Sequence, residues 1–179
     1  STYTAKGSTG TFTIGRAGNY TSRYWNGTID EVRLQNTSRT PQWIQTEYNN
    51  QKPDSNMTTT GTLECQNTCP GAWYNNSWPY RKPLTIDAAY VNGTHNNFPL
   101  LIRIPQDADI ARFAQNDADD IIFTNSSDGK LDHEIEQYNS TTGQLTAWIR
   151  LPTITNTTNT TIYLYFGNNT ITNQQNKTG

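Results

Sequence analysis

Residues 144–151 read QLTAWIRL, and this alternation of polar and apolar side chains decides the fold class. Successive side chains on a strand point to opposite faces of the sheet, so its apolar members share one face. Residues 160–166, TTIYLYF, repeat the pattern before Gly167. The apolar faces consist of Leu145, Ala147, Ile149 and Leu151, and of Ile162, Leu164 and Phe166. Both stretches predict half-buried strands of an antiparallel sheet.

Four earlier stretches are also predicted to be strands, and three of them alternate in the same way. They contain Leu84 and Ile86; Phe98, Leu100, Ile102 and Ile104; residues 120–124; and Leu131, His133, Ile135 and Gln137, with Asp132, Glu134, Glu136 and Tyr138 on the opposite face. Residues 107–114 predict a short helix that turns Ile110, Phe113 and Ala114 inward. Six short strands joined by turns predict an all-β, antiparallel, jelly-roll-like β-sandwich with short helices.

Residues 1–51 form a separate expected unit. Strands are predicted at 11–14 and at 28–34, with a bulge near Asp30 and Glu31. A short helix should follow, because Thr40 suits the N-cap and Pro41 the first helical position. Its spacing predicts an inward face made of Trp43, Ile44, Glu47 and Tyr48.

Residues 52–72 are predicted to be a linker, since they lack an apolar period and contain several chain breakers. Cys65 and Cys69 are the only two cysteines. An even count in an exported chain predicts a disulfide, here closing a loop too small to add much stability. A metal site would need two further ligands nearby. The sandwich is expected at 73–168, and residues 169–179 are expected to be a polar tail.

The composition excludes several classes of protein. A hydrophobic content of 32% is low for one large core and favours two thin β-layers. The net charge is -2 and the basic residues do not cluster, so the sequence predicts no positively charged surface that would bind nucleic acid. The longest apolar stretch, residues 99–102, is far short of the roughly 20 residues that span a bilayer, so membrane insertion is not expected.

The acceptor motif Asn-x-Ser/Thr for N-glycosylation occurs more often than the Asn and Thr content explains. The acceptors are Asn19, Asn26, Asn36, Asn56, Asn75, Asn92, Asn125, Asn139, Asn156, Asn159, Asn168 and Asn176. Covalent N-glycans require export past an oligosaccharide-transferring machinery, eukaryotic or archaeal. We therefore expect a secreted, cell-surface glycoprotein.

Two segments resemble known families. Residues 12–16 (FTIGR), residues 24–34 (YWNGTIDEVRL) and the short helix after them resemble the carboxyl-terminal end of laminin-G-like, concanavalin A-like lectin domains. Only about the first fifty residues are covered, so the resemblance implies a partial laminin-G-like β segment.

Residues 78–86 (WPYRKPLTI), 131–136 (LDHEIE), 147–152 (AWIRLP) and 162–168 (IYLYFGN) resemble the family called domain of unknown function 2341. The resemblance covers residues 73–168 and implies a β-sandwich module of large secreted or surface proteins. It implies no catalytic residues.

Candidate chemistry is sparse. Asp132, Glu134 and Glu136 could form a glycosidase carboxylate pair, but side by side on one strand they would normally be solvated or paired with Arg103 or Arg150. Calcium could bind near Asp30 and Glu31, or at Asp117, Asp119 and Asp120. His95 and His133 are isolated. We expect neither a catalytic centre nor a resident metal or cofactor beyond that possible calcium ion.

The aromatic residues leave two interpretations open. Tyr20, Tyr24, Trp25, Trp73, Tyr74, Trp78 and Tyr80 could stack on sugars or fill an interface, whereas Trp25 and Trp148 are expected by default to pack inside.

Strands 11–14 and 28–34 cannot close a sandwich, so their backbone groups need partners. The leading hypothesis is an extracellular, archaeal filament or surface-layer subunit whose copies add strands to one another head to tail. The alternative is a carbohydrate-binding adhesion module of a larger surface protein, with external glycans as partners.

Overall fold

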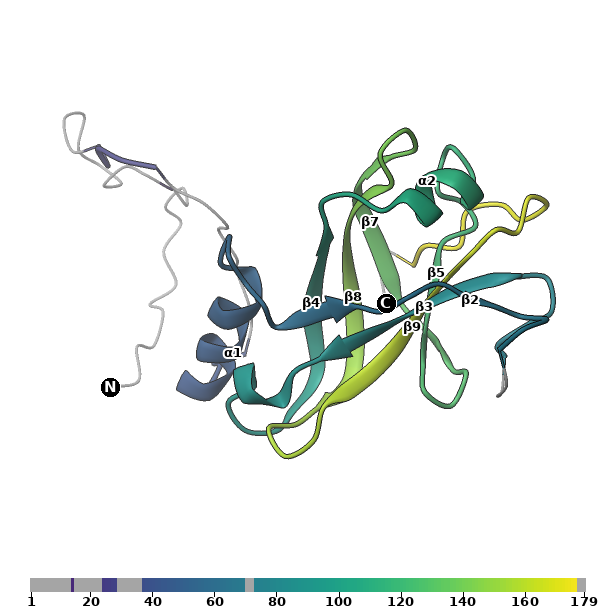
Figure 1. The fold of residues 1–179 in the computed structure, drawn as a ribbon. Helices are drawn as coiled ribbons and strands as arrows, with labels where there is room; N and C mark the ends of the chain where they lie inside the picture. The colour runs from purple at the N-terminus through teal and green to yellow at the C-terminus, as the bar shows by residue number, and fades with distance from the viewer. Residues whose placement is uncertain (1–13, 15–23, 29–36, 70–72, 177–179) are drawn as a thin grey trace. The chain divides into compact units, whose positions relative to one another are not determined.

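The computed structural model describes residues 14, 24–28, 37–69 and 73–176 (Figure 1). The chain divides into two compact units, Ser1–Ser38 and Arg39–Gly179. In the first unit, Ile14, Tyr24 and Trp25 are exposed. The strands expected at 11–14 and 28–34 lie largely outside the described residues, so they stay predictions.

The second unit contains two antiparallel sheets and short helices, which confirms the predicted fold class (Figure 1). Within the described residues, the larger sheet has the order β1-β3-β9-β5-β6, with β2 also paired to β3, and the smaller sheet has the order β4-β8-β7. The larger sheet consists of β1 (Thr58–Thr60), β2 (Glu64–Cys65), β3 (Tyr80–Ile86), β5 (Ile122–Asn125), β6 (Lys130–Leu131) and β9 (Thr160–Phe166). The smaller sheet consists of β4 (His95–Ile104), β7 (His133–Asn139) and β8 (Gln144–Ile154).

The apolar phases of the strands form the core. The buried cluster includes Leu84, Ile86, Phe98, Leu100, Ile102, Leu145, Ala147, Ile149, Leu151, Ile162, Leu164 and Phe166. Each leucine, isoleucine or phenylalanine among them stabilises the fold by about 1.5–3 kcal/mol when fully buried. The alternation in the sequence therefore identified the inward faces correctly.

Strand β7 departs from strict alternation. Its register with β8 shifts between Ile135 and Gln137, so Glu136 is an extra residue at a bulge. Tyr138 consequently packs against the core, while Gln137 is exposed. The predicted faces for these two residues were wrong because one extra residue reverses every later side chain.

Three short helices lie in the described part of this unit: α1 (Pro41–Gln51), the 3-10 helix η1 (Ala88–Tyr90) and α2 (Ala108–Phe113). Thr40 caps α1 as predicted, accepting a hydrogen bond of 3.2 Å from the Trp43 amide. The predicted inward face was only partly right, because Ile44 and Tyr48 are 57% and 63% exposed. Helix α2 has Ile110 buried, as predicted.

Helix α1 belongs with the second unit and covers the edge of β4. The Asn50 side chain accepts from the Leu101 amide at 2.7 Å and donates to the Leu101 carbonyl at 2.9 Å. Thr46, also buried, accepts from the Asn92 amide at 2.9 Å. The helix therefore buries polar groups that satisfy an otherwise open strand edge.

The expected linker, residues 52–72, contributes two strands to the larger sheet. Thr58–Thr60 pairs with Leu84–Ile86, and Met57 before it is fully buried. This stretch has no apolar period because its strands are only two or three residues long and lie at the sheet margin.

Cys65 and Cys69 are free thiols in the structure, so the predicted disulfide is not found. The Cys69 amide instead donates to the Cys65 carbonyl at 3.0 Å, which closes the turn after β2 with a backbone hydrogen bond. In the part of the chain that the structure describes, no helix is long and apolar enough to cross a membrane.

Candidate ligand-binding site on the smaller sheet

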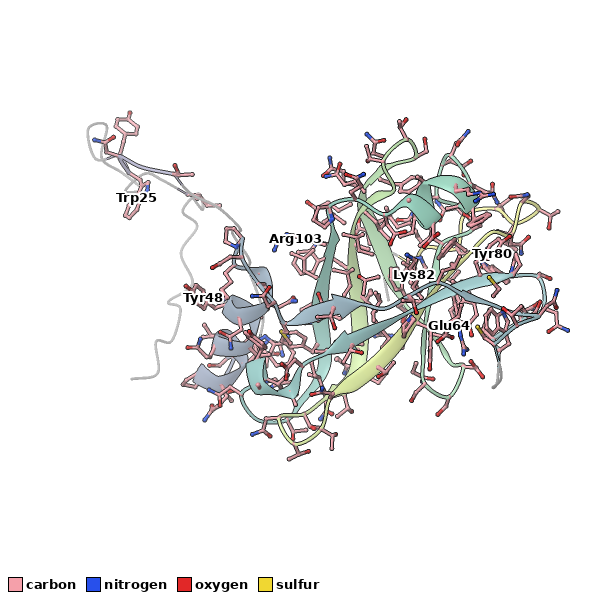
Figure 2. The ribbon with its side chains drawn as sticks, in the orientation of Figure 1. Trp25, Tyr48, Glu64, Tyr80, Lys82 and Arg103 are labelled. Carbon is pink, nitrogen blue, oxygen red and sulfur yellow. The ribbon has the colours of Figure 1, made fainter. Side chains whose placement is uncertain are left out.

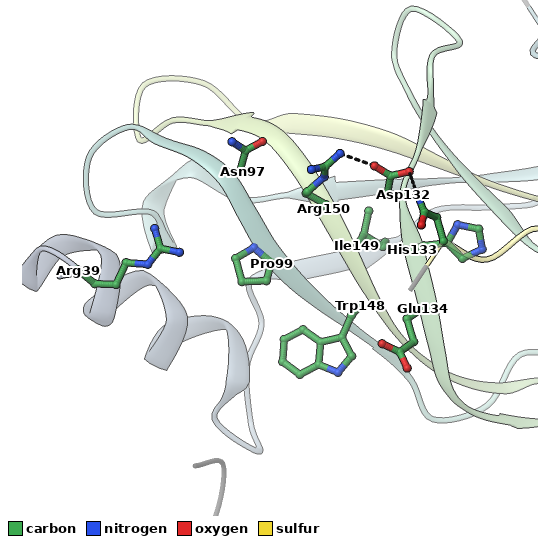
Figure 3. Close-up of a pocket in the computed structure, with 10 residues that line it drawn as sticks. Arg39, Asn97, Pro99, Asp132, His133, Glu134, Trp148, Ile149 and Arg150 are labelled. Carbon is green, nitrogen blue, oxygen red and sulfur yellow. Dashed lines mark hydrogen bonds and ion pairs between the residues drawn. The ribbon is translucent and has the colours of Figure 1, made fainter. Parts of the chain in front are cut away.

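A shallow pocket of about 270 Å³ lies on the outer face of the smaller sheet (Figure 3). It combines one large aromatic ring with charged and amide groups. Its lining residues are Arg39, Asn97, Pro99, Asp132, His133, Glu134, Trp148, Ile149, Arg150 and Asn176.

Trp148 is the large aromatic side chain that lines this pocket. Its neighbours Ala147 and Ile149 point into the core, so alternation turns the indole outward. In the register of the sheet, Trp148 lies between Leu101 of β4 and Glu134 of β7. The indole Nε1 donates a 2.8 Å hydrogen bond to Glu136 Oε2, which fixes the ring on the sheet surface.

A polar network closes one side of the pocket (Figure 3). Arg150 forms an ion pair with Asp132, and Asn176 Nδ2 donates to the other Asp132 oxygen at 2.8 Å. The hydrogen bond from Asn176, followed by the contact with Arg150, holds the pKa of Asp132 below its usual range. Asp132 therefore stays ionised and keeps Arg150 in place.

Arg39 and Asn97 also line the pocket. The Arg39 guanidinium lies 3.9 Å from the Trp43 ring centroid, in cation–π geometry. Asn97 has a φ of 53°, a left-handed conformation that is uncommon outside glycine and is found more often at binding sites. This backbone turn places an amide at the pocket.

The pocket carries balanced charge. The lining includes two guanidinium groups, Arg39 and Arg150, and two carboxylates, Asp132 and Glu134. Burial lowers the pKa of His133 and keeps its imidazole neutral. Figure 3 shows the His133 ring directed away from Trp148. A neutral polar ligand therefore suits the pocket better than a strongly charged one.

Two of the three carboxylates considered for glycoside hydrolysis are bonded to other side chains. Asp132 is paired with Arg150, and Glu136 accepts from Trp148. The lowered pKa of Asp132 is opposite to the raised pKa that a general acid requires.

The candidate calcium ligands do not converge. Asp120 is fully buried, and its two oxygens accept from the backbone amides of Gln115 and Gly167. Among the described residues, no group of three or more His, Cys, Asp or Glu side chains could hold a metal ion. Asp30 and Glu31 lie outside those residues.

Both histidines are buried. His95 Nε2 lies 2.9 Å from Thr46 Oγ1, and the ring packs between Trp43 and Phe98. His133 Nδ1 lies 3.3 Å from the Leu131 carbonyl. Burial lowers the pKa of His95 as it does that of His133, so both imidazoles are neutral packing groups.

Most of the aromatic residues considered for stacking on sugars pack internally. Trp78 is 4% exposed and donates from Nε1 to the Asp120 carbonyl, and Trp73 and Tyr74 pack beside it. Tyr80 stacks on Phe113 with ring centroids 4.1 Å apart. Tyr24 and Trp25 are exposed, and Tyr20 lies outside the described residues.

The acceptor asparagines differ in accessibility. Most are exposed: Asn26, Asn56, Asn75, Asn92, Asn139, Asn156, Asn159 and Asn176. Asn125 is half-buried in a turn, and Asn19 and Asn36 lie outside the described residues. Asn168 is only 5% exposed, and its Oδ1 accepts from Thr170 Oγ1 at 2.9 Å. Asn168 is therefore the least accessible of the described acceptor asparagines.

Sequence reasoning missed the pocket because it assigned Trp148 to the interior by default. One signal was present: Trp148 shares its phase with Thr146 and Arg150, the polar face of the strand. Arg39, Asn97 and Asn176 carried no such signal, because they reach the pocket from three separate segments.

These features define a two-sheet, antiparallel β domain with a small polar–aromatic pocket on one outer face. The family model described as "Domain of unknown function (DUF2341)" matches residues 117–179, which include β5 to β9 and therefore Asp132, Trp148 and Arg150. The match begins later in the chain than the expected residue 73, and no comparison supports the laminin-G-like segment. No curated protein matches the chain, and no solved structure does.

Proposed function

We propose that this chain is an extracellular carbohydrate-binding module that holds a neutral sugar against Trp148 on the outer face of the smaller sheet. The main support for this proposal is the composition of the pocket, in which a partly exposed indole lies among amide, carboxylate and guanidinium groups. An indole offers a flat apolar surface to the C–H face of a sugar, and the surrounding groups can hydrogen-bond its hydroxyls.

The size of the pocket indicates what binds. Its volume of about 270 Å³ is slightly below the range of about 300–1,000 Å³ for drug-sized ligands. One sugar residue, with its neighbours extending into solvent, fits a pocket of this kind. We therefore expect weak monovalent binding that is strengthened when several modules or several glycan branches engage together.

A glycan array followed by calorimetry tests the proposal. Trp148→Ala should weaken binding of the best array ligand at least about tenfold, a loss of about 1.4 kcal/mol. Asn97→Gly should also weaken it, because glycine accepts the positive φ while removing the amide. Trp25→Ala is the matched control, since Trp25 is exposed but lies in the other unit. Equal binding by Trp148→Ala and the parent chain would contradict the proposal.

The filament hypothesis stays a prediction, because it rests on residues 1–38. In the described part of the second unit, both outer strands of the smaller sheet already have hydrogen-bond partners from the same chain. Asn50 bonds the edge of β4, and Gln175 and Asn176 bond the edge of β7. Electron microscopy of the purified protein tests it: uniform filaments would favour assembly, and monomers that bind glycans would favour the module.

A further inference from the structure

Lys82 occupies an inward-facing position of β3. It shares its phase with Leu84 and Ile86 and lies opposite Leu164 in the register with β9. Its side chain is only 8% exposed. Figure 2 marks its place on the ribbon. Lysine is rarely this buried unless it is paired, so its partners matter.

Two carboxylates from the start of α2 face this amine. Asp107 Oδ2 lies 2.6 Å from Lys82 Nζ, and Asp109 Oδ2 lies 2.7 Å from the same atom. The Asp107 side chain is 10% exposed and that of Asp109 is 37% exposed. One ammonium thus faces two carboxylates, one enclosed and one open to solvent.

The Asp107 carboxyl is held rigidly. Its Oδ1 accepts from the backbone amides of Asp109 and Ile110 at 3.0 and 3.1 Å, while Oδ2 faces the lysine. The Asp107 amide donates to the Thr142 carbonyl at 3.0 Å. Gly143 then packs so closely that a Cβ there would lie 1.9 Å from the Asp107 carbonyl oxygen. The turn between β7 and β8 therefore fixes Asp107 in front of Lys82.

The amine and the carboxyl group that an amide-forming reaction would join lie side by side here. A carboxyl C–O bond is about 1.2 Å long, so Asp107 Cγ lies within about 3.8 Å of Lys82 Nζ. That is close to the separation of about 3–3.5 Å typical of near-attack conformers. The two backbone amides on Oδ1 are positioned as an oxyanion site, and Asp109 is within reach of the amine proton.

We propose that Lys82 and Asp107 form an intramolecular isopeptide bond, with Asp109 carrying the protons and the amides of Asp109 and Ile110 stabilising the intermediate.

The reaction balances without a co-reactant. Burial alone would lower the pKa of Lys82, but hydrogen bonds with Asp107 and Asp109 raise it, so the ion pair is the resting state. Asp109 first relays one ammonium proton to Oδ2 of Asp107, so that a neutral amine faces a neutral carboxyl group. Nζ then attacks Cγ and forms the C–N bond. Asp109 passes a second proton from the nitrogen to Oδ2, the C–Oδ2 bond breaks, and Oδ2 departs as water with both protons, which leaves Asp109 as a carboxylate again. The ammonium and carboxylate thus become one amide and one water molecule.

The oxygen that remains in the amide is Oδ1, so the two hydrogen bonds that cap α2 persist after the reaction. The bond would join β3 of the larger sheet covalently to α2. A cross-link of this kind stabilises a domain chiefly by restricting the unfolded chain.

Intact-mass spectrometry of the full chain, made in a host that does not glycosylate, tests the proposal. The mass should be lower than the sequence mass by one water molecule, and protease digestion should yield a branched peptide joining Lys82 to Asp107. Lys82→Arg should keep the ion pair but show the full mass, because a guanidinium is a poor nucleophile. Asp107→Asn should lose ammonia in place of water, and Asp109→Ala should form the bond more slowly.

The Lys82→Arg variant also excludes dehydration elsewhere, for example at Asp128-Gly129, since such a loss would persist in it. A folded parent chain that keeps its full mass after prolonged incubation would overturn the proposal. So would a water loss that Lys82→Arg retains. In either case Lys82, Asp107 and Asp109 form only a buried ion-pair cluster.

Discussion

Asp120 shows how one buried carboxylate organises the end of the larger sheet. It is fully buried before β5, and its oxygens accept from the Gln115 amide at 2.9 Å and the Gly167 amide at 2.6 Å. Its carbonyl accepts from Trp78 Nε1 at 2.6 Å. One residue therefore joins the loop after α2, the end of β9 and the aromatic layer on the outer face.

We predict that Asp120→Asn destabilises the domain by about 2–4 kcal/mol. An amide offers one acceptor oxygen, so its NH₂ group must face one of the two backbone N–H donors. Urea denaturation followed by circular dichroism measures the loss. Asp54→Asn, at an exposed aspartate, is the control and should change stability by less than about 0.5 kcal/mol.

The stability difference between the parent chain and Asp120→Asn should change with pH in a defined direction. Burial raises the pKa of Asp120 above its ordinary 3.8, although the backbone hydrogen bonds oppose the shift. A raised folded-state pKa contributes stability that is present at acidic pH and lost as pH rises through that pKa. The stability advantage of the parent chain over Asp120→Asn should therefore decrease as pH rises. An advantage that grew with pH over that range would contradict this assignment.

At the scale of elements, α1 acts as the cover of a strand edge. Strand β4 lies at the margin of the smaller sheet, where its outward amides and carbonyls would otherwise be unpaired within the described residues. Asn50 bonds both backbone groups of Leu101, and Arg103 Nη1 donates to the Gln51 carbonyl at 2.9 Å. The docked face of the helix therefore combines Thr46 and Asn50, which form hydrogen bonds, with Trp43, which packs in the core.

Asn50→Ala should destabilise the domain by about 2–4 kcal/mol, because it leaves a buried amide and a buried carbonyl without partners. Hydrogen exchange at the Leu101 amide should be faster in Asn50→Ala than in the parent chain. Gln45→Ala, on the exposed side of the same helix, is the control. Unchanged protection of Leu101 in Asn50→Ala would show that the edge is satisfied in another way.

The elements differ in how far the sequence predicted them. Strands β4 and β8 were predicted well, because Phe98 to Ile104 and Leu145 to Leu151 alternate without interruption. Thr40 and Pro41 located the start of helix α1. Its buried face was predicted from hydrophobicity alone, which cannot reveal that Asn50 is buried because its side chain hydrogen-bonds the backbone of Leu101. Strands β1 and β2 were missed because two or three residues are too few to show a period.

At the scale of the whole unit, the two outer faces of the sheets differ. The larger sheet carries a second buried cluster, in which Trp73, Tyr74 and Trp78 pack on Tyr165 and Ile122. Arg81 lies 4.3 Å from the Trp73 ring centroid and 4.2 Å from that of Tyr163, which closes this face further. The smaller sheet instead presents Trp148 in a pocket, so ligand binding is expected on that side.

Glycosylation should follow the accessibility of the acceptor sites. Peptide mapping of protein from its native source should find Asn168 unmodified, because it is buried and bonded to the threonine of its own motif. Exposed Asn92 and Asn156 are the internal comparison within the same sample. A glycan at Asn168 would mean that the end of β9 differs from the arrangement described above.

A nuclear magnetic resonance titration of the five indole N–H groups with the best glycan ligand shows whether a sugar binds beside Trp148. The binding account predicts that the Trp148 signal shifts progressively, while those of Trp25, Trp43, Trp73 and Trp78 stay in place. A saturating titration that leaves Trp148 unmoved, or that moves another indole instead, would contradict a sugar site on the outer face of the smaller sheet.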